Sequence, residues 1–291
     1  MAKKISLDLI KKVRSDTGAG MVDVKKALEE ADGDVDRAKE ILREKGVQAA
    51  GKREGRKAQE GLALAKIVDE EGRKVGYAIE LNTETDFVAK TPQFIAYAER
   101  LLDIAVQTRA SERVQLLEAK GETESVKEII DSAAALFKEN IKLGQVGRVE
   151  GEEVNLYAHK KSAEFPPSIV ALVATDEAGS KIAHDVALQV SAMSPFWLSE
   201  EDVPADVVES ESRIAEGKAR QEGKPEGIIG KIVQGRIKSF YEETVLLDQK
   251  YVKDPSKTIG QLAKEAGGAI TSFLRIEVGK GEEESRQEAE E

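Results

Sequence analysis

Few residues of this chain have the type and spacing that catalysis or metal binding needs. Its two histidines, His159 and His184, are far apart in the sequence, and it has no cysteine. Two histidines exclude a multi-histidine metal site and leave few candidates for a histidine-based triad. Neither a Walker loop nor a GxGxxG motif occurs. Because 55 acidic residues always provide pairs somewhere, carboxylate catalysis stays open. We nevertheless predict a protein without metal, cofactor or covalent chemistry.

The residues best placed to act on another molecule are Thr85, Asp86, Phe87 and Val88. A strand is expected to end near residue 81 and a helix to begin near Pro92. The tetrapeptide would then lie on a short turn, where a rigid scaffold presents an aromatic ring outward. In the alternative, Thr85 or Asp86 caps a helical turn and Phe87 packs inward, as most phenylalanines do. Taken alone, the residue types favour this second alternative.

The composition is that of a globular protein of about two domain-sized units. Of 291 residues, 40% are apolar and 34% are charged, which allows a packed core beneath a charged surface. The lack of cysteine suits a reducing compartment. No apolar run is long enough to cross a bilayer, and the first residues lack the apolar region of a signal peptide. We therefore expect a cytoplasmic protein without membrane contact.

Charge is distributed unevenly along the chain. The net charge is -11, which argues against a general nucleic-acid binder, because phosphate contacts need a dense basic face. The first 60 residues carry 15 basic and 12 acidic residues, a net of +3, so the remainder carries -14. A mildly basic head thus precedes an acidic body, and no direct nucleic-acid contact is expected.

Hydrophobic spacing predicts three short helices in residues 1–46. Ser6 is expected to cap the first helix, Gly18 and Gly20 to form the turn after it, Asp34 to cap the third and Gly46 to end it. Residues 47–60 contain four basic residues and two glycines and are predicted to be a linker. Its charges are interpreted as solvated, and contact with an acidic partner is the alternative.

A similar pattern occurs twice in the body, in residues 61–150 and 151–198. Strand-like runs at 62–68 and 75–81 precede a helix that Thr91 and Pro92 begin, and runs at 154–158 and 169–174 precede a helix that opens at Ser180. An amphipathic helix near 126–137 lies between the two strand–helix patterns. The pattern predicts an α+β body of two similar subdomains joined by helices.

The last third of the chain departs from this pattern. Within residues 199–248, the part up to 224 has few large apolar side chains and the part after it has many. We predict that the two parts form a helical hairpin that projects from the body. In residues 249–280, a short helix at 259–265 and a strand at 271–278 return the chain to the sheet. Residues 281–291 contain six glutamates and one arginine, which is typical of an acidic disordered tail.

Two stretches carry a resemblance to a known family. They are RSDTGAGMVDVKKAL at residues 14–28 and ELNTETDFVAK at residues 80–90, and they closely resemble the two signatures of bacterial elongation factor Ts. KTIGQL at 257–262 and FLRIEVG at 273–279 are also similar to that family, so the match spans nearly the full chain. The resemblance implies a ubiquitin-associated-like three-helix domain, a two-subdomain α+β core with antiparallel sheets and an inserted coiled-coil hairpin.

The resemblance also implies an activity and a partner. Members of this family are guanine nucleotide exchange factors for elongation factor Tu, which they bind in its GDP-bound and nucleotide-free forms. They promote GDP release by displacing magnesium and loosening the nucleotide site, and GTP then reloads. In this chain Thr85, Asp86, Phe87 and Val88 would enter the partner's G domain. Phe87 would wedge between helices, and Asp86 and its neighbours would disturb the magnesium site.

Further contacts with the partner are implied for the head and for one strand. Met21, Val22 and Lys25 match positions at the start of the second helix that face the G domain. His159, in a Tyr-x-His element, would face the partner's third domain. From the residue types alone, a core position and an interface position are equally expected for Met21, and Lys25 is expected to be a solvated lysine. A lone histidine on a strand, such as His159, usually has a structural role.

Two other classes of protein are weighed against this interpretation. The three-helix head could instead belong to an adaptor that binds ubiquitin-like proteins, although the Thr-Asp-Phe-Val element and the acidic core have no place there. A carboxylate enzyme lacks any positioned nucleophile or phosphate loop in the sequence. A homodimer through the helical hairpin is compatible with the exchange factor, because such a hairpin can pair across a two-fold axis.

Overall fold

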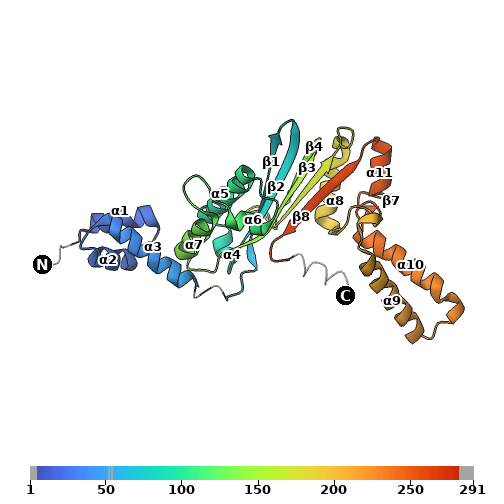
Figure 1. Ribbon diagram of the computed structural model, residues 1–291, viewed down its shortest axis with the longest axis horizontal. Coiled ribbons are helices and arrows are strands. Elements are labelled where there is room, and N and C mark those ends of the chain that lie inside the picture. Colours follow the sequence, from blue (N-terminus) through green and yellow to red (C-terminus); the bar gives the residue numbers. More distant parts are fainter. Residues whose placement is uncertain (1–4, 52, 54, 282–291) are drawn as a thin grey trace.

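The computed structural model describes residues 5–51, 53 and 55–281 of the chain. The elements form an elongated arrangement with the N-terminal helices at one end, two sheets in the middle and a helical hairpin at the other end (Figure 1). The architecture is mixed α+β with antiparallel sheets, as the sequence predicts. The predicted acidic tail, apart from Gly281, lies outside the described residues.

The N-terminal helices are α1 (Leu7–Thr17), α2 (Met21–Glu30) and α3 (Val35–Gly51). Their ends follow the sequence signals. Ser6 accepts a hydrogen bond from the Leu9 N–H at 3.2 Å, Asp34 accepts from Asp36 and Arg37, and Gly18 ends α1 in the left-handed conformation. The apolar faces meet in one small core, made by Ile10, Val13, Val24, Ala27, Leu28, Ala31, Ala38 and Ile41. We call residues 5–51 the head.

The expected end of the third helix at Gly46 is wrong, because α3 continues to Gly51. The predicted linker at 47–60 therefore begins inside this helix. Gly46 has another use: a Cβ atom there would lie 2.7 Å from the Cβ of Ala135 in α7 (Val126–Phe137), and α3 packs against α7. The glycine permits the close approach of α3 and α7. This contact with the body stabilises the last turns of α3, which lie beyond the core of the head.

The first sheet contains β1 (Glu60–Glu70), β2 (Arg73–Thr83) and β3 (Lys142–Gly151) in that order, all antiparallel. The hairpin between β1 and β2 is the predicted one, and β3 was not predicted. Glu71 and Gly72 form the turn with φ values of 55° and 85°, the backbone that two-residue hairpins prefer. The sheet is thus built from one tight local pairing and one strand that returns from far along the chain.

Helices cover one face of this sheet. They are α4 (Asp86–Ala89), α5 (Pro92–Thr108), α6 (Arg113–Glu118) and α7, and their apolar faces pack with β2 in the largest core cluster. Thr91 caps α5 with proline in its first turn, as predicted, and Ser125 caps α7 with a capping box. Because β2 also packs on its other face, its side chains are buried on both sides from Val75 to Thr83, including those of Glu80 and Asn82.

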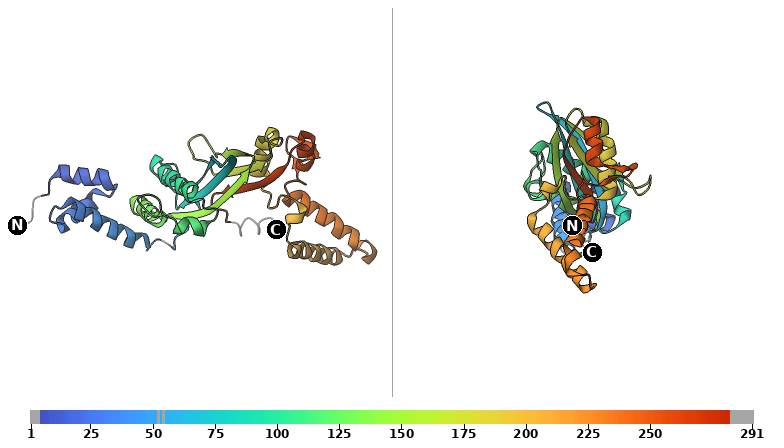
Figure 2. Two further views of the ribbon diagram at one scale, coloured as in Figure 1. Left: turned by 45° about the horizontal axis from the view of Figure 1, so that its top comes forward. Right: turned by 90° about the vertical axis from the view of Figure 1, so that its right-hand side faces the viewer.

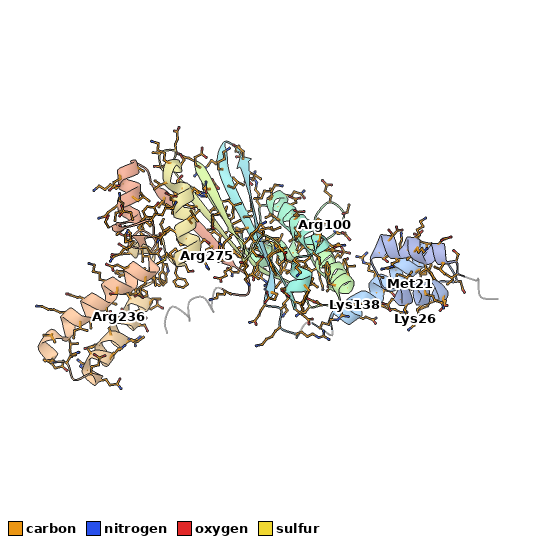
Figure 3. The ribbon with its side chains drawn as sticks, turned by 180° about the vertical axis from the view of Figure 1, so that it is seen from behind. Met21, Lys26, Arg100, Lys138, Arg236 and Arg275 are labelled. Carbon is orange, nitrogen blue, oxygen red and sulfur yellow. The ribbon has the colours of Figure 1, made fainter. Side chains whose placement is uncertain are left out.

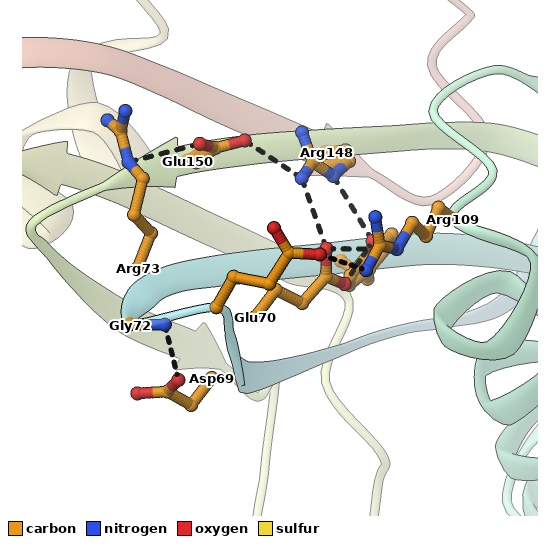
Figure 4. Close-up of polar contacts among 9 residues, drawn as sticks. Asp69, Glu70, Gly72, Arg73, Arg109, Arg148 and Glu150 are labelled. Carbon is orange, nitrogen blue, oxygen red and sulfur yellow. Dashed lines mark hydrogen bonds and ion pairs between the residues drawn. The ribbon is translucent and has the colours of Figure 1, made fainter.

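A network of polar side chains lies at the turn end of the β1–β2 hairpin, around Glu70 (Figure 4). Glu70 accepts a hydrogen bond from the Tyr77 hydroxyl at 2.6 Å and lies 3.4 Å from both Arg109 and Arg148. The Tyr77 hydroxyl, followed by the two guanidinium groups, holds the pKa of Glu70 below its ordinary value. Arg148 also pairs with Glu150 at 2.9 Å. These contacts join β1, β2 and β3 at the edge where the strands leave the core.

The second sheet has the order β4 (Glu153–His159), β5 (Ile169–Thr175) and β8 (Ile270–Glu277). Helices α8 (Ser180–Met193) and α11 (Ile259–Ala266) pack on its outer face. Its inner face packs on the first sheet through a cluster of mostly small side chains, namely Ala63, Ala78, Val149, Val170, Leu172, Ala174 and Ile276. The body therefore has four layers, helix, sheet, sheet and helix. After residue 249 the chain returns to this sheet as β8, which pairs with β5.

Two helices form the projecting hairpin, α9 (Ala205–Gln221) and α10 (Glu226–Thr244), which lie against each other (Figure 2). A 3-10 turn at Glu200–Asp202 leads into α9. The base is tied to the body by backbone hydrogen bonds from Phe196 to Thr244 and from Leu246 to Trp197, at 2.9 and 2.8 Å. A short ribbon of β6 (Lys250–Tyr251) and β7 (Asp254–Thr258) then leads to α11.

Candidate functional site

The tetrapeptide at 85–88 lies where β2 passes into helix α4. Thr85 is the N-cap residue, and its hydroxyl oxygen accepts from the Val88 N–H at 3.4 Å. Val88 packs against the main core and Ala89 is buried. Val88 and Ala89 therefore form the inward face of this one-turn helix, and its opposite face points to solvent.

Phe87 lies on the outward face and its side chain is 71% exposed. The expectation of a capped helical turn is thus confirmed, and the expectation that Phe87 then packs inward is wrong. The physical reason is that Val88 and Ala89 already occupy the inward side of this one-turn helix. The carboxylate of Asp86, beside the ring in the sequence, has no hydrogen bond or ion pair among the described residues. The turn thus presents an apolar ring next to an unengaged negative charge.

A lysine lies between Phe87 and a second aromatic ring. The Lys90 ammonium is 5.1 Å from the ring centroid of Phe87 and 5.4 Å from that of Phe165. Phe165 belongs to the loop between β4 and β5, so the second sheet contributes to the surroundings of the turn at 85–88. Cation–π contacts of this kind favour one orientation of an exposed ring. Neither Lys90 nor Phe165 was singled out in the sequence, and no signal there brings residue 165 next to residue 87.

The head residues predicted for partner contact lie on α2. Met21 is 46% exposed and Val22 is 65% exposed, whereas Val24 is fully buried in the head core. Lys25 forms an exposed pair with Glu29 at 3.7 Å. Met21 therefore lies at the surface and outside the core cluster, although residue types alone left this open. Figure 3 shows Met21 at one end of the molecule and Arg236 of the hairpin at the other.

A cleft of about 840 Å³ lies between the head, α5 and α7, beside the packing contact of α3 with α7. Charged side chains of both signs line it, among them Lys39, Arg43, Asp23 and Lys138. Lys39 pairs with Asp16, Arg43 with Glu128, and Lys138 with Asp23. Within the described part of the chain, Met21, Val22 and Lys25 are not among its lining residues, so the exposed apolar pair of α2 lies outside the cleft.

His159 is the last residue of β4 and is exposed. Its Nδ1 lies 3.3 Å from the hydroxyl oxygen of Tyr157, and the two rings are 6.3 Å apart. The predicted site residues thus fall on separate elements: Met21, Val22 and Lys25 on α2, the turn at 85–88 on the first sheet, and His159 on the second. An extended partner surface would be needed to reach all of them.

No metal centre or membrane segment is found in the described part of the molecule. Residues 5–51, 53 and 55–281 contain no group of three or more histidine, cysteine or acidic side chains arranged to hold a metal ion. None of the helices in these ranges is long and apolar enough to cross a membrane. Phe87, Met21 and Val22 are exposed apolar side chains, and Asp86 is half-buried beside Phe87. Such a surface is suited to binding another macromolecule.

Comparison with known proteins agrees with the signatures. A family profile described as "Elongation factor TS" matches residues 84–280, more than half of the chain. Elongation factor Ts of Bifidobacterium longum subsp. infantis is 61% identical over 280 residues, covering 96% of this chain and 99% of that protein. The protein of Bifidobacterium adolescentis is 59% identical with the same coverage, and that of Beutenbergia cavernae is 48% identical, covering 93% of this chain and 97% of its own length. The chain belongs to the elongation factor Ts family.

Proposed function

We propose that this protein promotes the release of GDP from elongation factor Tu in the bacterial cytoplasm, so that GTP can bind. No covalent chemistry is needed. A protein that binds the nucleotide-free partner more tightly than the GDP-bound partner must weaken GDP binding by the same factor, because the two equilibria are linked. Family membership and the two signatures support this function.

The observation that carries the proposal at the level of the site is the exposure of Phe87 on a capped, one-turn helix. A large apolar ring that the fold leaves in solvent gains free energy when a partner covers it. In our proposal Phe87 enters the partner's G domain between helices, and Asp86 approaches the magnesium site. Thr85 and Val88 hold the turn, the first as the cap and the second by its packing.

The partner's magnesium ion explains why a small displacement is sufficient. Magnesium demands a nearly ideal octahedral set of oxygen ligands and bridges the phosphates to the G protein. Moving one ligand or the phosphate loop by roughly an ångström disrupts that set and removes much of the attraction for GDP. Asp86 adds a negative charge that competes for the same cation. The nucleotide then leaves, and this protein is displaced when GTP binds.

Other surfaces would extend the interface. We propose that Met21, Val22 and Lys25 of the head contact the G domain, and that His159 contacts the third domain of the partner. Their exposure supports both assignments. Because these surfaces lie on different elements, they can position the turn at 85–88 while contributing binding energy of their own.

The finer architecture is also proposed. We assign residues 1–46 to a ubiquitin-associated-like domain and 61–150 and 151–198 to two core subdomains, completed by 249–280. Residues 199–248 form a coiled coil. Ile214 and Ile228 of its helices are exposed, which supports self-association of the hairpin into a homodimer.

The test is the release of fluorescent GDP from elongation factor Tu, with this protein absent, present, or present as Phe87→Ala. We expect strong acceleration by the wild type. The variant should lose about 2 kcal/mol of interaction, roughly thirtyfold in rate, because exposed aromatic anchors dominate such interfaces. It should fold normally, since the ring is 71% exposed.

Val114→Ala is the matched control, because Val114 is also a large exposed apolar residue, at 61%. It should exchange like the wild type. Wild-type rates with Phe87→Ala would refute the role of the turn. If the intact protein fails to accelerate release at all, the exchange function is wrong, and capture by immobilised ubiquitin would then test the adaptor alternative.

A further inference from the structure

One carboxylate, that of Glu139, binds the residues that precede helix α4. Its Oε2 atom accepts from the Thr83 hydroxyl at 2.6 Å and from the backbone N–H groups of Glu84 and Thr85, each at 3.0 Å. Its Oε1 atom accepts from the Thr85 hydroxyl at 2.7 Å. Four donors from three consecutive residues thus converge on one side chain that lies 54 to 56 positions away in the sequence.

The charge of the half-buried Glu139 is satisfied by hydroxyl and amide donors. None of the ion pairs among the described residues involves Glu139, although most other charged contacts pair a carboxylate with lysine or arginine. Its partners are amides and hydroxyls, and hydrogen bonds to a charged acceptor are short and stronger than neutral ones. The amides of Glu84 and Thr85 lie between the end of β2 and the start of α4, so they need an acceptor outside both elements.

In a second set of contacts between the same segments, the donor lies near residue 139 and the acceptor near residue 84. Glu84 accepts from the backbone N–H of Asn140 at 2.7 Å, and the buried side chain of Asn140 donates to the carbonyl of Arg56 at 2.6 Å. Lys138 ends α7 in the left-handed conformation, with φ of 60°, and so redirects the chain toward the end of β2. The segments 83–85 and 139–140 are therefore cross-linked by reciprocal bonds.

The contact with the Thr85 hydroxyl has a directional consequence. A hydroxyl has one proton to donate and lone pairs to accept with. Because Glu139 is a carboxylate that only accepts, the Thr85 proton points to Glu139, and a lone pair is left for the Val88 N–H at 3.4 Å. Glu139 thus selects the hydroxyl orientation in which Thr85 caps α4.

We propose that Glu139 is a positioning residue for nucleotide exchange, which holds α4 in the orientation that presents Phe87. This rests on the proposed function of Phe87. A helix of four residues has no stability of its own, and the contact with Lys90 orients the ring relative to α4 but does not fix α4 itself. Without the carboxylate, the turn would have to be ordered when the partner binds, at the expense of binding free energy.

The experiment compares Glu139→Ala, Glu139→Gln and Phe87→Ala with the wild type in GDP release from elongation factor Tu. Glu139→Ala should accelerate GDP release about tenfold less than the wild type does. Glu139→Gln keeps an oxygen for the two amides and Thr83, so it should restore much of the rate. Glu122→Ala removes an exposed glutamate from a different loop and should behave as the wild type.

Amide hydrogen exchange of the same variants, followed by NMR, provides a readout that general destabilisation would not reproduce. In Glu139→Ala the amides of Glu84, Thr85 and Val88 should exchange faster, while that of Ile79 in the middle of β2 stays protected. In Glu139→Gln their protection should be close to that of the wild type.

The outcomes separate the two proposals. If Glu139→Ala is folded and exchanges nucleotide as the wild type while Phe87→Ala does not, the positioning role is refuted and the function of Phe87 stands. Unchanged protection of the three amides in Glu139→Ala would also refute it. If Phe87→Ala keeps wild-type rates, the function of the turn is wrong, and the role of Glu139 in exchange is wrong with it.

Discussion

Single residues of the same type behave differently here because their neighbours differ. Phe87 and Phe94 are seven positions apart, on α4 and α5. Phe94 is fully buried and packs in a T-shaped arrangement with Phe137, with 5.8 Å between the ring centroids. Such a ring contributes to the core, and its truncation would leave a cavity. Phe87 lies in solvent and contributes little to the stability of the fold. Its ring contributes free energy only when another molecule covers it.

A second residue gives a pH-dependent contribution to stability. The hydroxyl of buried Tyr251 donates to Asp185 at 2.6 Å, and Lys253 contacts the other oxygen of that carboxylate at 2.6 Å. Burial, followed by the hydrogen bond to Asp185, raises the pKa of Tyr251 to about 12. The neutral hydroxyl is thus favoured in the folded state. This contribution is fully present below the ordinary pKa of 10 and is lost as the pH rises through about 12.

We therefore expect Tyr251→Phe to be less stable than the wild type at pH 8, by about 1 kcal/mol for the lost hydrogen bond. The difference should shrink as the pH rises from 10 to 12, because only the wild type loses this contribution. Urea unfolding of both proteins across that range measures it. A difference that stays constant with pH would contradict the assignment.

At the scale of elements, the hairpin offers two glycines in open space that differ only in backbone conformation. A Cβ atom at Gly223 or Gly230 would meet no atom within 4 Å. Gly223 lies in the turn after α9 with φ of 72°, whereas Gly230 lies inside α10. Alanine is strained at the first position and is the preferred residue at the second.

Gly223→Ala should consequently destabilise the hairpin by about 1 kcal/mol, and Gly230→Ala should stabilise it by roughly the same amount. Thermal unfolding followed by circular dichroism gives the two shifts. Each substitution is the control for the other, since both add one methyl group that touches nothing. Shifts of the same sign would show that the conformation of the turn does not control the hairpin.

At the scale of the whole molecule, the attachment of the head decides how its surface lies relative to the turn at 85–88. The second half of α3 packs on α7 at Gly46, and the exposed pairs Arg43–Glu128 and Lys138–Asp23 lie beside this contact. Exposed pairs of this kind contribute little and are screened by salt. The close approach at Gly46 should therefore be the main determinant of the attachment.

Gly46→Val tests this attachment. Added carbon atoms at residue 46 would collide with Ala135, so we expect the head to separate from α7 and the radius of gyration in small-angle scattering to rise. Gly51→Val is the control, because it lies at the end of the same helix with no atom within 4 Å. Unchanged scattering from a folded Gly46→Val would show that the head is attached in another way.

Much of this molecule follows from local sequence signals. The caps Ser6, Asp34 and Thr91, the glycine turn after α1 and the tight β1–β2 hairpin depend on neighbours a few positions away, and all were predicted. The two signatures, each a run of consecutive residues, also indicate the family. What was not predicted, such as β3 and the continuation of α3, depends on pairing with segments far along the chain.

The sequence by itself determined the family, the α+β class and the position of the helical hairpin, because periodicity, caps and signatures are properties of consecutive residues. Only the tertiary structure decided that Phe87 faces solvent, that Gly46 is a packing contact and that Glu139 holds the turn before α4. Each of these depends on which distant side chain occupies the adjacent space: Val88 and the core for Phe87, Ala135 for Gly46, and Thr83 to Thr85 for Glu139. Such proximity arises only when the layers of the fold pack together.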